Sequence, residues 1–364
     1  MKVLHVYKDY FPPTHGGVEQ HIHDLVHALD GVECTVLTSS RTRRATLERD
    51  GPVAVVRARE WARVASTPIT PAWRRHLAES DAGLMHFHMP SPIGELAFLA
   101  ARPRAPMVAT YHADIVGRDG LHALFAPFQQ RFLARARRIV VGSPVLRDTS
   151  PALAPHRARI VVIPYGVDAD RWSARPASAE ALRARHRPPL VLFLGRFRRY
   201  KGVHVLIDAM RDVAGTLLVV GDGPGRAALE RRAAEAGLAD RTVFAGEVPD
   251  ELRAAYYHAA DVFVLPSTTR AESFGIAMLE AMACGTPVIC TEVGTGTTWL
   301  NRHDETGLVV PPDDARALAA ALTSLLADGA RRREMGLAAA SRVRESFTKR
   351  AMVQSIGSLY AQVG

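Results

Sequence analysis

Short apolar runs alternate along the chain with helix-like segments rich in Ala, Leu and Arg. The strand-like runs are 3–6, 35–38, 53–56, 84–86, 107–110, 139–141 and 160–163 in the first half, and 190–194, 216–220, 242–245, 262–265, 287–290 and 307–310 in the second. Apolar strands that alternate with helices are typical of parallel sheets covered on both faces. The pattern therefore predicts an α/β fold with two doubly wound sheets.

The break between the two sheets falls near the middle of the chain. The segment 164–168 and the polar stretch that follows it to Pro188-Pro189 continue no strand pattern, and prolines interrupt helices there. We expect a first domain over 1–168, a second domain over 169–347, and a helical terminal segment over 348–364.

Composition fits a globular enzyme-sized protein. The chain has 364 residues, 48% of them hydrophobic and 23% charged, and about 150 residues per domain also predicts two domains. It contains no apolar run long enough to span a bilayer and opens on a strand-like run, so we expect a soluble, cytoplasmic protein. Three cysteines without a CxxC pair argue against a disulfide framework and a thiolate metal site.

The net charge is basic, but it does not identify the kind of partner. The net charge is +9, and residues 1–180 hold 23 basic and 17 acidic side chains. A basic surface attracts nucleic acid, anionic lipid or phosphorylated substrates. Because aromatic residues make up only 7% and the arginines are scattered, the sequence gives little support to nucleic-acid binding. The segment 121–138, with Phe125, Phe128 and nearby arginines, could instead lie on an anionic membrane, although a half-buried helix shows the same pattern.

Glycine-rich turns follow several of the predicted strands. Gly16 and Gly17 precede an amphipathic helix, where backbone amides could approach an anion or simply make a tight turn. Arg196 and Lys201 follow the first strand of the second half, at the edge where open α/β sheets bind ligands. Gly221 belongs to a GDGPG turn that has Arg226 where a dinucleotide-binding GxGxxG motif needs glycine, so we expect it only to shape a nucleotide pocket.

The segment 266–287 carries the most specific pattern. A helix is expected to start near Phe274-Gly275 and to stop at Gly285, which places Glu272 just before the helix and Glu280 about two turns inside it. The two carboxylates must therefore have different roles. Free amides around Phe274 to Ile276 could meet an anion or a sugar hydroxyl, Glu272 a second hydroxyl, and Glu280 a ribose.

The histidines include one candidate sugar contact and two His-x-His pairs that could be taken for metal ligands. His112 and Asp114 close a first-half strand, where His112 is a candidate sugar contact and Asp114 could orient it. The pairs His86-x-His88 and His21-x-His23 are expected to point to opposite sides, and neither has a Cys or carboxylate set at ligand spacing. We therefore expect no bound metal.

Taken together, these motifs resemble the retaining glycosyltransferases of family four, which have the GT-B fold. The matching elements run in the expected order over almost the whole chain: Gly16-Gly17, 110–114, 163–168, Gly195-Arg196, Lys201-Gly202, 221–224 and 272–280. One departure is Tyr165, where many members carry Asn. The segment 291–301 also resembles mannosyl- and rhamnosyltransferases that build bacterial surface polysaccharides.

The resemblance implies two Rossmann-like domains that face each other across a cleft, with the terminal helix packed back on the first. It implies a nucleotide-diphosphate sugar donor on the second domain and a glycan or lipid-linked acceptor on the first. Arg196 and Lys201 would clamp the diphosphate, Glu280 the ribose, and Glu272 with Ser273, Phe274, Gly275 and Ile276 the donor sugar. Val248 and Gly221 would border the base, Gly17 would close over the phosphates, and His112 would contact the sugar near its reacting carbon.

The implied chemistry is hexosyl transfer with retention of configuration and without a metal or other cofactor, since the two cations stabilise the departing diphosphate. The inner face of the plasma membrane is the place where such an acceptor would be met. Two alternatives stay open: a nucleotide-sugar epimerase or hydrolase of the same fold, for which no additional acid/base pair is found, and a basic nucleic-acid-binding protein.

Overall fold

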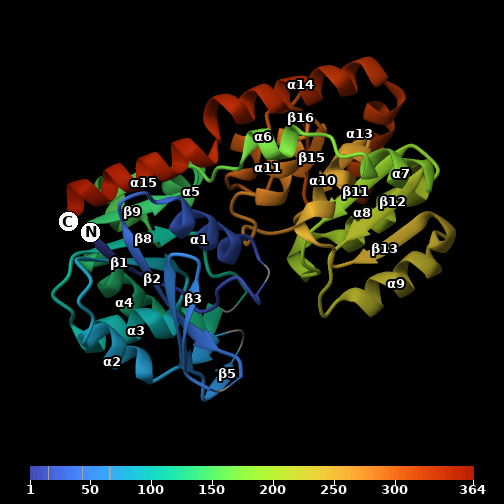
Figure 1. The fold of residues 1–364 in the computed structure, drawn as a ribbon. Helices are drawn as coiled ribbons and strands as arrows, with labels where there is room; N and C mark the ends of the chain where they lie inside the picture. The colour runs from blue at the N-terminus through green and yellow to red at the C-terminus, as the bar shows by residue number, and fades with distance from the viewer. Residues whose placement is uncertain (15, 43, 65–66, 118) are drawn as a thin grey trace. The chain divides into compact units, whose positions relative to one another are not determined.

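The chain folds into two compact units. A computed structural model describes residues 1–364 except 15, 43, 65–66 and 118. The first unit comprises Met1–Pro164 and Met352–Gly364, and the second comprises Tyr165–Ala351 (Figure 1). These limits lie four residues from the boundaries expected from the sequence, on both sides of the second unit.

The first unit is built on an eight-stranded sheet of order β10-β9-β8-β7-β1-β2-β4-β3. Its strands are β1 (Lys2–Val6), β2 (Glu33–Ser40), β3 (Thr46–Asp50), β4 (Val53–Arg59), β7 (Leu84–Met89), β8 (Met107–Tyr111), β9 (Arg138–Val141) and β10 (Ile160–Val162), and a separate hairpin is formed by β5 (Ala62–Val64) and β6 (Thr67–Ile69). Only β3 pairs antiparallel within the sheet. The helices are α1 (Gly17–Ala28), α2 (Ala72–Ala78), α3 (Pro92–Ala101), α4 (Asp119–Arg135), α5 (Pro144–Thr149) and the 3-10 turn Ala154–Arg159.

The second unit holds a six-stranded, fully parallel sheet of order β13-β12-β11-β14-β15-β16. Its strands are β11 (Leu190–Leu194), β12 (Thr216–Val220), β13 (Thr242–Gly246), β14 (Val262–Leu265), β15 (Val288–Thr291) and β16 (Gly307–Val310). Its helices are α6 (Ala169–Ser173), α7 (Ser178–Ala184), α8 (Val203–Ala209), α9 (Arg226–Glu235), α10 (Asp250–Ala259), α11 (Ile276–Ala283), α12 (Thr297–Leu300), α13 (Ala315–Ala327) and α14 (Gly329–Ser346), with 3-10 turns at Arg199–Lys201, Met210–Asp212 and Ala239–Arg241.

The predicted α/β architecture is confirmed. Each of the thirteen strand-like runs forms a strand, and both large sheets have apolar cores on their two faces. The sequence pattern missed β3, because its residues (TLERD) are polar and mostly exposed at the sheet edge. It also missed the β5–β6 hairpin, whose three-residue strands are too short to show a period.

The last helix, α15 (Lys349–Val363), ties the end of the chain to its beginning. Its residues Met352, Ile356, Leu359 and Tyr360 are buried in the same core cluster as Val3 of β1. Both chain ends lie together beside this helix in Figure 1. The Tyr360 hydroxyl reaches His86 on β7, so the terminal helix places a polar group inside the first unit.

Candidate active site

The carboxyl edge of the second sheet is a set of loops tied to one another by backbone hydrogen bonds. The amide of Thr268, after β14, donates to the carbonyl of Tyr200, after β11, at 2.7 Å. The amide of Gly195 donates to Val220 at 3.0 Å, which joins the loops after β11 and β12. Because parallel strands bring their carboxyl ends to one edge, side chains from distant segments meet here.

Lys201 and Glu272 form a buried ion pair in this loop cluster. Lys201 ends the 3-10 turn Arg199–Lys201, and its Nζ lies 2.5 Å from Oε2 of Glu272. Ser267 donates to the same oxygen at 3.1 Å. Burial by itself lowers the pKa of Lys201, but the adjacent carboxylate outweighs it and raises that pKa above its ordinary value. The lysine therefore carries a fixed positive charge.

Glycine at position 202 makes this placement of Lys201 feasible. Gly202 has φ of +69°, and a Cβ built there would lie 1.8 Å from the carbonyl oxygen of Pro266. No side chain fits between the two loops at that distance. The close approach brings the loop after β11 against the loop that leads to Glu272.

Arg196 is exposed on the same loop. Its guanidinium has no ion-pair or hydrogen-bond partner within the described part of the chain, in contrast to Lys201. The loop after β11 therefore carries two cations, the exposed Arg196 and the largely buried Lys201, and only Lys201 is paired with a carboxylate. The arrangement can take up an anion.

Helix α11 begins and ends close to where the sequence predicts. Gly275 precedes its first turn with φ of +92°, no side chain caps its first amides, and Gly285 follows with φ of +74°. Glu280 lies one turn, not two, inside the helix, because the helix starts at Ile276. The uncapped amides leave this N-terminus able to receive an anion or a hydroxyl.

The residues before α11 are held by packing. The ring of Phe274 is buried and lies 4.9 Å from the ring of Tyr165, so the departure from the family pattern at 165 fills space against the loop before α11. The carbonyl of Ser273 accepts from Gly296 at 2.9 Å, and the carbonyl of Glu272 accepts from the Thr295 hydroxyl at 2.6 Å. The loop that carries Glu272 is therefore fixed on both sides.

Glu280 lies in a buried charge cluster that the sequence did not reveal. Its Oε2 accepts hydrogen bonds from Tyr257, at 2.7 Å, and from the Arg253 guanidinium. Burial raises the pKa of Glu280, although Arg253 works against that shift. The partners come from α10, and nothing in the spacing of the sequence linked that helix to Glu280.

The two predicted base-side positions lie at the same sheet edge. Gly221 follows β12 with φ of +120°, and its amide donates to Gly246 at 2.7 Å. Val248 lies two residues beyond β13 and is half-buried against the core. A side chain at 221 would collide with the Gly195 carbonyl, so this turn also brings backbone against backbone.

In the first unit, His112 follows β8 and belongs to a row of buried histidines. Its Nε2 lies 3.1 Å from Nδ1 of His88, whose Nε2 lies 3.2 Å from Nδ1 of His5. His86 contacts Thr110 at 2.7 Å and Tyr360 at 2.5 Å. Burial, with charge repulsion from His21, holds the pKa of His112 well below its ordinary value, so the ring is neutral.

The expectation that His86 and His88 point to opposite sides is wrong. Residues two apart on a strand share a face, and these rings stack with their centroids 4.4 Å apart. His5, on the neighbouring strand, is in register with His86. One ligand nitrogen from each of the three rings lies within 4.8 Å of the others. Their nitrogens are already engaged with one another, Thr110 and Tyr360.

The sequence also singles out Asp114, Gly16 and Gly17 in the first unit. Asp114 accepts hydrogen bonds from Tyr111 at 3.0 Å and from Ser150 at 2.6 Å. Gly16 precedes α1 in extended conformation and Gly17 is its exposed first residue. His15 of the same motif lies outside the described residues. Lys201 and Glu272 are thus the pair of predicted catalytic residues that the structure brings into contact.

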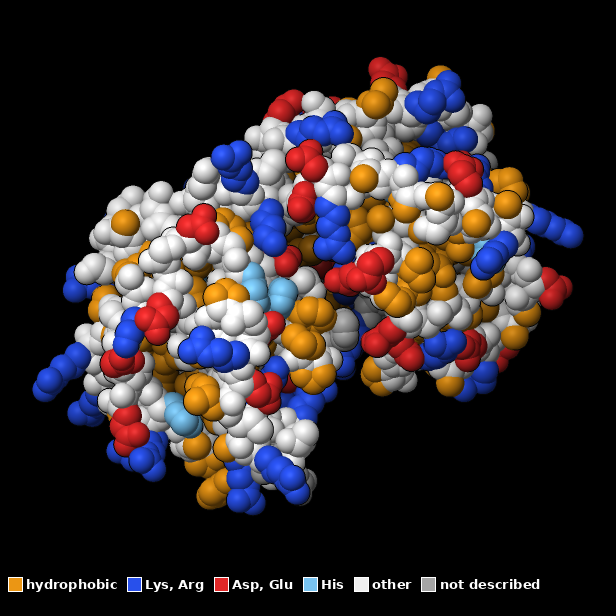
Figure 2. All heavy atoms as spheres, in the orientation of Figure 1, with side chains coloured by type: hydrophobic (Ala, Val, Ile, Leu, Met, Phe, Trp, Pro, Cys, Tyr) orange, Lys and Arg blue, Asp and Glu red, His pale blue; other side chains and the backbone are white. Residues whose placement is uncertain are grey.

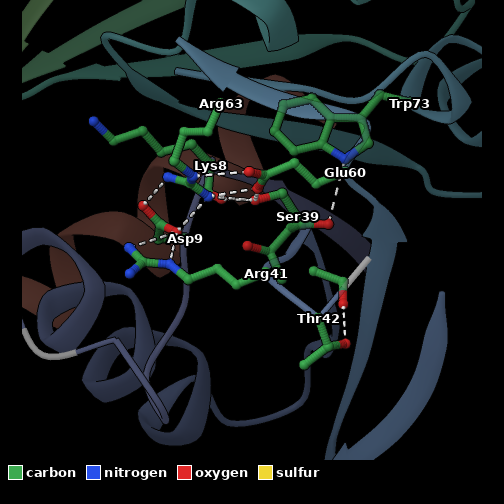
Figure 3. Close-up of polar contacts among 10 residues, drawn as sticks. Lys8, Asp9, Ser39, Arg41, Thr42, Glu60, Arg63 and Trp73 are labelled. Atoms are coloured by element: carbon green, nitrogen blue, oxygen red, sulfur yellow. Dashed lines mark hydrogen bonds and ion pairs between the residues drawn. The ribbon is translucent and has the colours of Figure 1, made fainter. Parts of the chain in front are cut away.

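Sequence reasoning missed a polar network at the carboxyl edge of the first sheet. Arg41 and Arg63 approach the buried carboxylate of Asp9 from two sides (Figure 3), and Arg63 makes two contacts of 3.1 Å with it. Arg63 also contacts Glu60 at 2.8 Å. Trp61, which follows Glu60 in the sequence, is 65% exposed. In this network Asp9, Arg41 and Glu60 follow the neighbouring strands β1, β2 and β4, and Arg63 lies in β5.

Two surface features bear on partners. None of the described helices has both the length and the apolar character needed to cross a bilayer. Leu124 and Phe128 of α4 are exposed, and the Arg131 guanidinium lies 5.8 Å from the Phe128 ring centre. On the face drawn in Figure 2, basic side chains are interspersed with acidic ones and form no continuous stripe.

Comparison with known proteins agrees with the motifs. A family model described as Glycosyltransferase Family 4 matches residues 15–171, and one described as Glycosyl transferases group 1 matches residues 174–342. The chain is 34% identical over 99% of its length to O-antigen chain mannosyltransferase C of Escherichia coli, of which it covers 98%. It is 38% identical over 96% of its length to D-rhamnosyltransferase WbpZ of Pseudomonas aeruginosa, of which it covers 92%.

A third relative is a GDP-mannose-dependent alpha-(1-6)-phosphatidylinositol monomannoside mannosyltransferase of Mycobacterium tuberculosis, 32% identical over 93% of this chain and 92% of the relative. Among solved structures, sucrose-phosphate synthase from Thermosynechococcus elongatus superposes with a TM-score of 0.84 at 27% identity, covering 99% of this chain and 98% of that one. Anabaena HepE in complex with UDP-glucose has the same fold, with a TM-score of 0.81 at 21% identity over the full length of both chains.

These relatives are sugar transferases, so they support transfer over the epimerase, hydrolase and nucleic-acid-binding alternatives. Family models match both halves of the chain, and relatives above 30% identity span nearly all of it. The chain therefore belongs to the family-four glycosyltransferases of the GT-B fold.

Proposed function

We propose that this protein transfers a hexose from a nucleotide-diphosphate sugar, of the GDP-mannose type or a UDP-sugar, to a glycan or lipid-linked acceptor during bacterial polysaccharide or glycoconjugate synthesis. The names of the relatives support the reaction and the setting. The observation that carries the proposal is the buried Lys201–Glu272 pair beside the exposed Arg196, at the ligand-binding edge of the second sheet.

The two cations act on the leaving group. When the bond between sugar and diphosphate breaks, negative charge grows on the diphosphate and positive charge on the sugar ring. Lys201 is held in place by Glu272 before the substrate binds, so its charge needs no reorganisation during the reaction. Arg196 supplies a fork-shaped set of donors for phosphate oxygens. These charges take the role that a divalent ion would have, and we propose a metal-independent transfer without a cofactor.

The remaining donor contacts follow from position. Glu272, Ser273 and the amides of Phe274, Gly275 and Ile276 receive the donor sugar at the start of α11. Glu280 receives the ribose, and Gly221 and Val248 border the base. The leaving diphosphate itself accepts the proton of the acceptor hydroxyl, and the configuration of the sugar is retained.

The acceptor belongs to the first unit in this proposal. His112 is neutral and contacts the sugar near its reacting carbon, while Asp114 helps to fix the loop after β8. Gly16 and Gly17 contact the donor phosphates. The Arg63 guanidinium, which Asp9 and Glu60 hold and which is 22% exposed, offers donors to sugar hydroxyls, and the exposed Trp61 offers a stacking surface.

We further propose that the protein is cytoplasmic and associates peripherally with the inner face of the plasma membrane. The exposed Leu124 and Phe128 would enter the interface, and Arg131 would meet anionic headgroups. Vesicle sedimentation tests this part. The wild type should sediment with anionic vesicles and not with neutral ones, and Leu124→Ser/Phe128→Ser should stay in solution.

The first experiment is a thermal-shift panel with UDP-, GDP-, ADP- and dTDP-sugars at equal concentration, first without metal and then with magnesium. A ligand that binds only the folded protein raises the unfolding midpoint, by an amount that corresponds to about 2.7 kcal/mol at a hundred times its Kd. One base should stabilise the protein without metal. Stabilisation by none of the four, with or without magnesium, would contradict the proposed donor site.

A further inference from the structure

We propose that His23, His27 and Asp50 form a binding site for one divalent transition-metal ion, of which Zn²⁺ is the best match. The site lies in the first unit, between helix α1 and the end of β3. None of these three residues has a role in the proposed transfer reaction, and the metal site does not depend on the proposed function.

The spacing of the ligand atoms suits a small tetrahedral ion. Nε2 of His23 and Nε2 of His27 each lie 3.5 Å from Oδ2 of Asp50. An ion with bonds of about 2.0–2.1 Å to nitrogen and oxygen places two ligands at a tetrahedral angle about 3.4 Å apart. One ligand atom from each of the three side chains lies within 4.8 Å of the others.

The helix and the turn explain why these side chains converge. His23 and His27 are four residues apart on α1, so they lie on one face of the helix, and their ring centres are 4.1 Å apart. Asp50 is the last residue of β3, followed by Gly51 with φ of +56° at the turn into β4. Backbone geometry therefore presents two imidazoles and one carboxylate from separate elements.

Hydrogen bonds around His27 orient it as a ligand. Its Nδ1 lies 2.8 Å from the His23 carbonyl oxygen, so Nδ1 carries the proton and donates. Its Nε2 lies 3.0 Å from the carbonyl oxygen of Asp50. With the proton on Nδ1, the neutral ring leaves the Nε2 lone pair free, so a cation at Nε2 would replace the proton that the protonated ring directs at Asp50. Donation from the far nitrogen to a carbonyl is the usual support of a metal-bound histidine.

The other two ligands have supporting contacts as well. The Tyr10 hydroxyl donates to Oδ2 of Asp50 at 3.1 Å, which helps to fix the carboxylate. The Nδ1 of His23 is buried and has no hydrogen-bond partner among the described residues, while Oδ1 of Asp24 lies 3.7 Å from it. Binding at Nε2 would set the proton on Nδ1, where this second carboxylate can orient it.

The donor set identifies the class of ion. Two neutral imidazoles and a carboxylate suit Zn²⁺ and neighbouring transition metals and are poor ligands for Ca²⁺ or Mg²⁺, which prefer oxygen. The three side chains are partly exposed, at 22%, 22% and 31%, so an ion has access from solvent and can keep a water ligand. Because Gly17 begins α1, a bound ion would fasten the glycine loop's helix to the β3–β4 turn.

The test uses the full-length chain without a histidine tag, treated with a chelator and then titrated with Zn²⁺ by calorimetry. We expect one ion per chain and a rise in the unfolding midpoint on binding. Co²⁺ in the same protein should give the intense visible absorption of a four-coordinate site. His27→Gln and Asp50→Asn should each weaken Zn²⁺ binding by at least about tenfold.

His76→Gln is the matched control, since His76 is an exposed histidine outside both histidine clusters, and it should bind Zn²⁺ like the wild type. Circular dichroism and metal-free unfolding midpoints verify that each variant is folded. A wild type that binds no Zn²⁺ overturns the proposal. Full binding by a folded His23→Gln/His27→Gln variant also overturns it, because the ion would then be held elsewhere, such as at His5, His86 and His88.

Discussion

Nζ of Lys201 lies 2.5 Å from Oε2 of Glu272, across loops that are 71 residues apart in the chain. The pair is buried and holds the lysine in one position. If this charge acts on the departing diphosphate, its removal should cost more in the transition state than in the ground state.

We therefore expect Lys201→Ala to lower kcat by about 10²–10³-fold and to raise the donor Kd by less than tenfold. Steady-state kinetics and calorimetry measure the two effects. Lys2→Ala is a matched control, because Lys2 has a 2.5 Å ion pair with Asp81 on the exposed surface, and it should change neither constant. Equal losses in kcat and in donor affinity would contradict the clamp role.

Gly202 provides a second test of the same loops. Gly202→Ala should destabilise the protein by about 1–3 kcal/mol beyond the cost of its positive φ and should lower kcat, because the added Cβ forces the backbone at Pro266 to shift. Gly237→Ala shares the positive φ, at +71°, but its Cβ would meet no atom within 4 Å. Urea unfolding of both variants isolates the contact. Similar stability losses would show that the close approach is unimportant.

Glu280 combines two roles that can be separated. Glu280→Ala should weaken donor binding and destabilise the second unit by about 1–3 kcal/mol, since Arg253 would lose its bond to Glu280 and keep only its 3.2 Å contact with Asp250. Tyr257→Phe removes only one hydrogen bond to that carboxylate and should cost about 1–2 kcal/mol.

The ribose contact has its own measurement. The wild type should bind a nucleoside diphosphate more tightly than the analogue that lacks the ribose hydroxyls, and Glu280→Gln should reduce that preference by about tenfold. A preference that survives in folded Glu280→Gln protein would place the ribose elsewhere.

The buried histidines predict acid lability of the first unit. Burial lowers the pKa of His5 to about 3 and that of His21 to about 4, against 6.5 in the unfolded chain. Below pH 6.5 the unfolded state therefore binds more protons than the folded state. These histidines do not reduce the free energy of unfolding above that pH, and this free energy falls as the pH drops towards 4. Urea unfolding at a series of pH values gives the free energy of unfolding as a function of pH. This free energy should fall less steeply with decreasing pH in His5→Gln than in the wild type, and His76→Gln should behave like the wild type. An unchanged slope in the His5 variant would contradict this.

Trp61 tests the acceptor side. Trp61 is 65% exposed and follows Glu60 of the Asp9–Arg63 network in the chain, and stacking on an acceptor sugar is the contact that its ring can provide. Trp61→Ala should raise the acceptor KM by about tenfold and leave the donor Kd unchanged. Leu47→Ala, on an apolar residue that is 75% exposed on β3, should change neither. A loss of donor affinity in Trp61→Ala would place the ring at the donor instead.

Much of the candidate donor site could be outlined from the sequence because its residues follow strands in the order of the chain. Arg196, Lys201, Gly221 and Glu272 each lie in a loop that follows an apolar strand, and parallel strands bring those loops to one edge. The partner of Glu280 could not be predicted, since Arg253 lies 27 residues away on another helix and its approach depends on how α10 packs.

The sequence by itself determined the class of fold, the two sheets and the glycine-rich turns that follow their strands. The physical reason is that buried parallel strands need apolar residues along their whole length, and close backbone contacts such as that of Gly202 need glycine. The order of strands within a sheet is a long-range property. It placed His5 beside His86, and packing of α1 on the end of β3 brought His23 and His27 to Asp50. Only the tertiary structure decided those contacts, because they depend on which elements become neighbours and not on the local pattern of either.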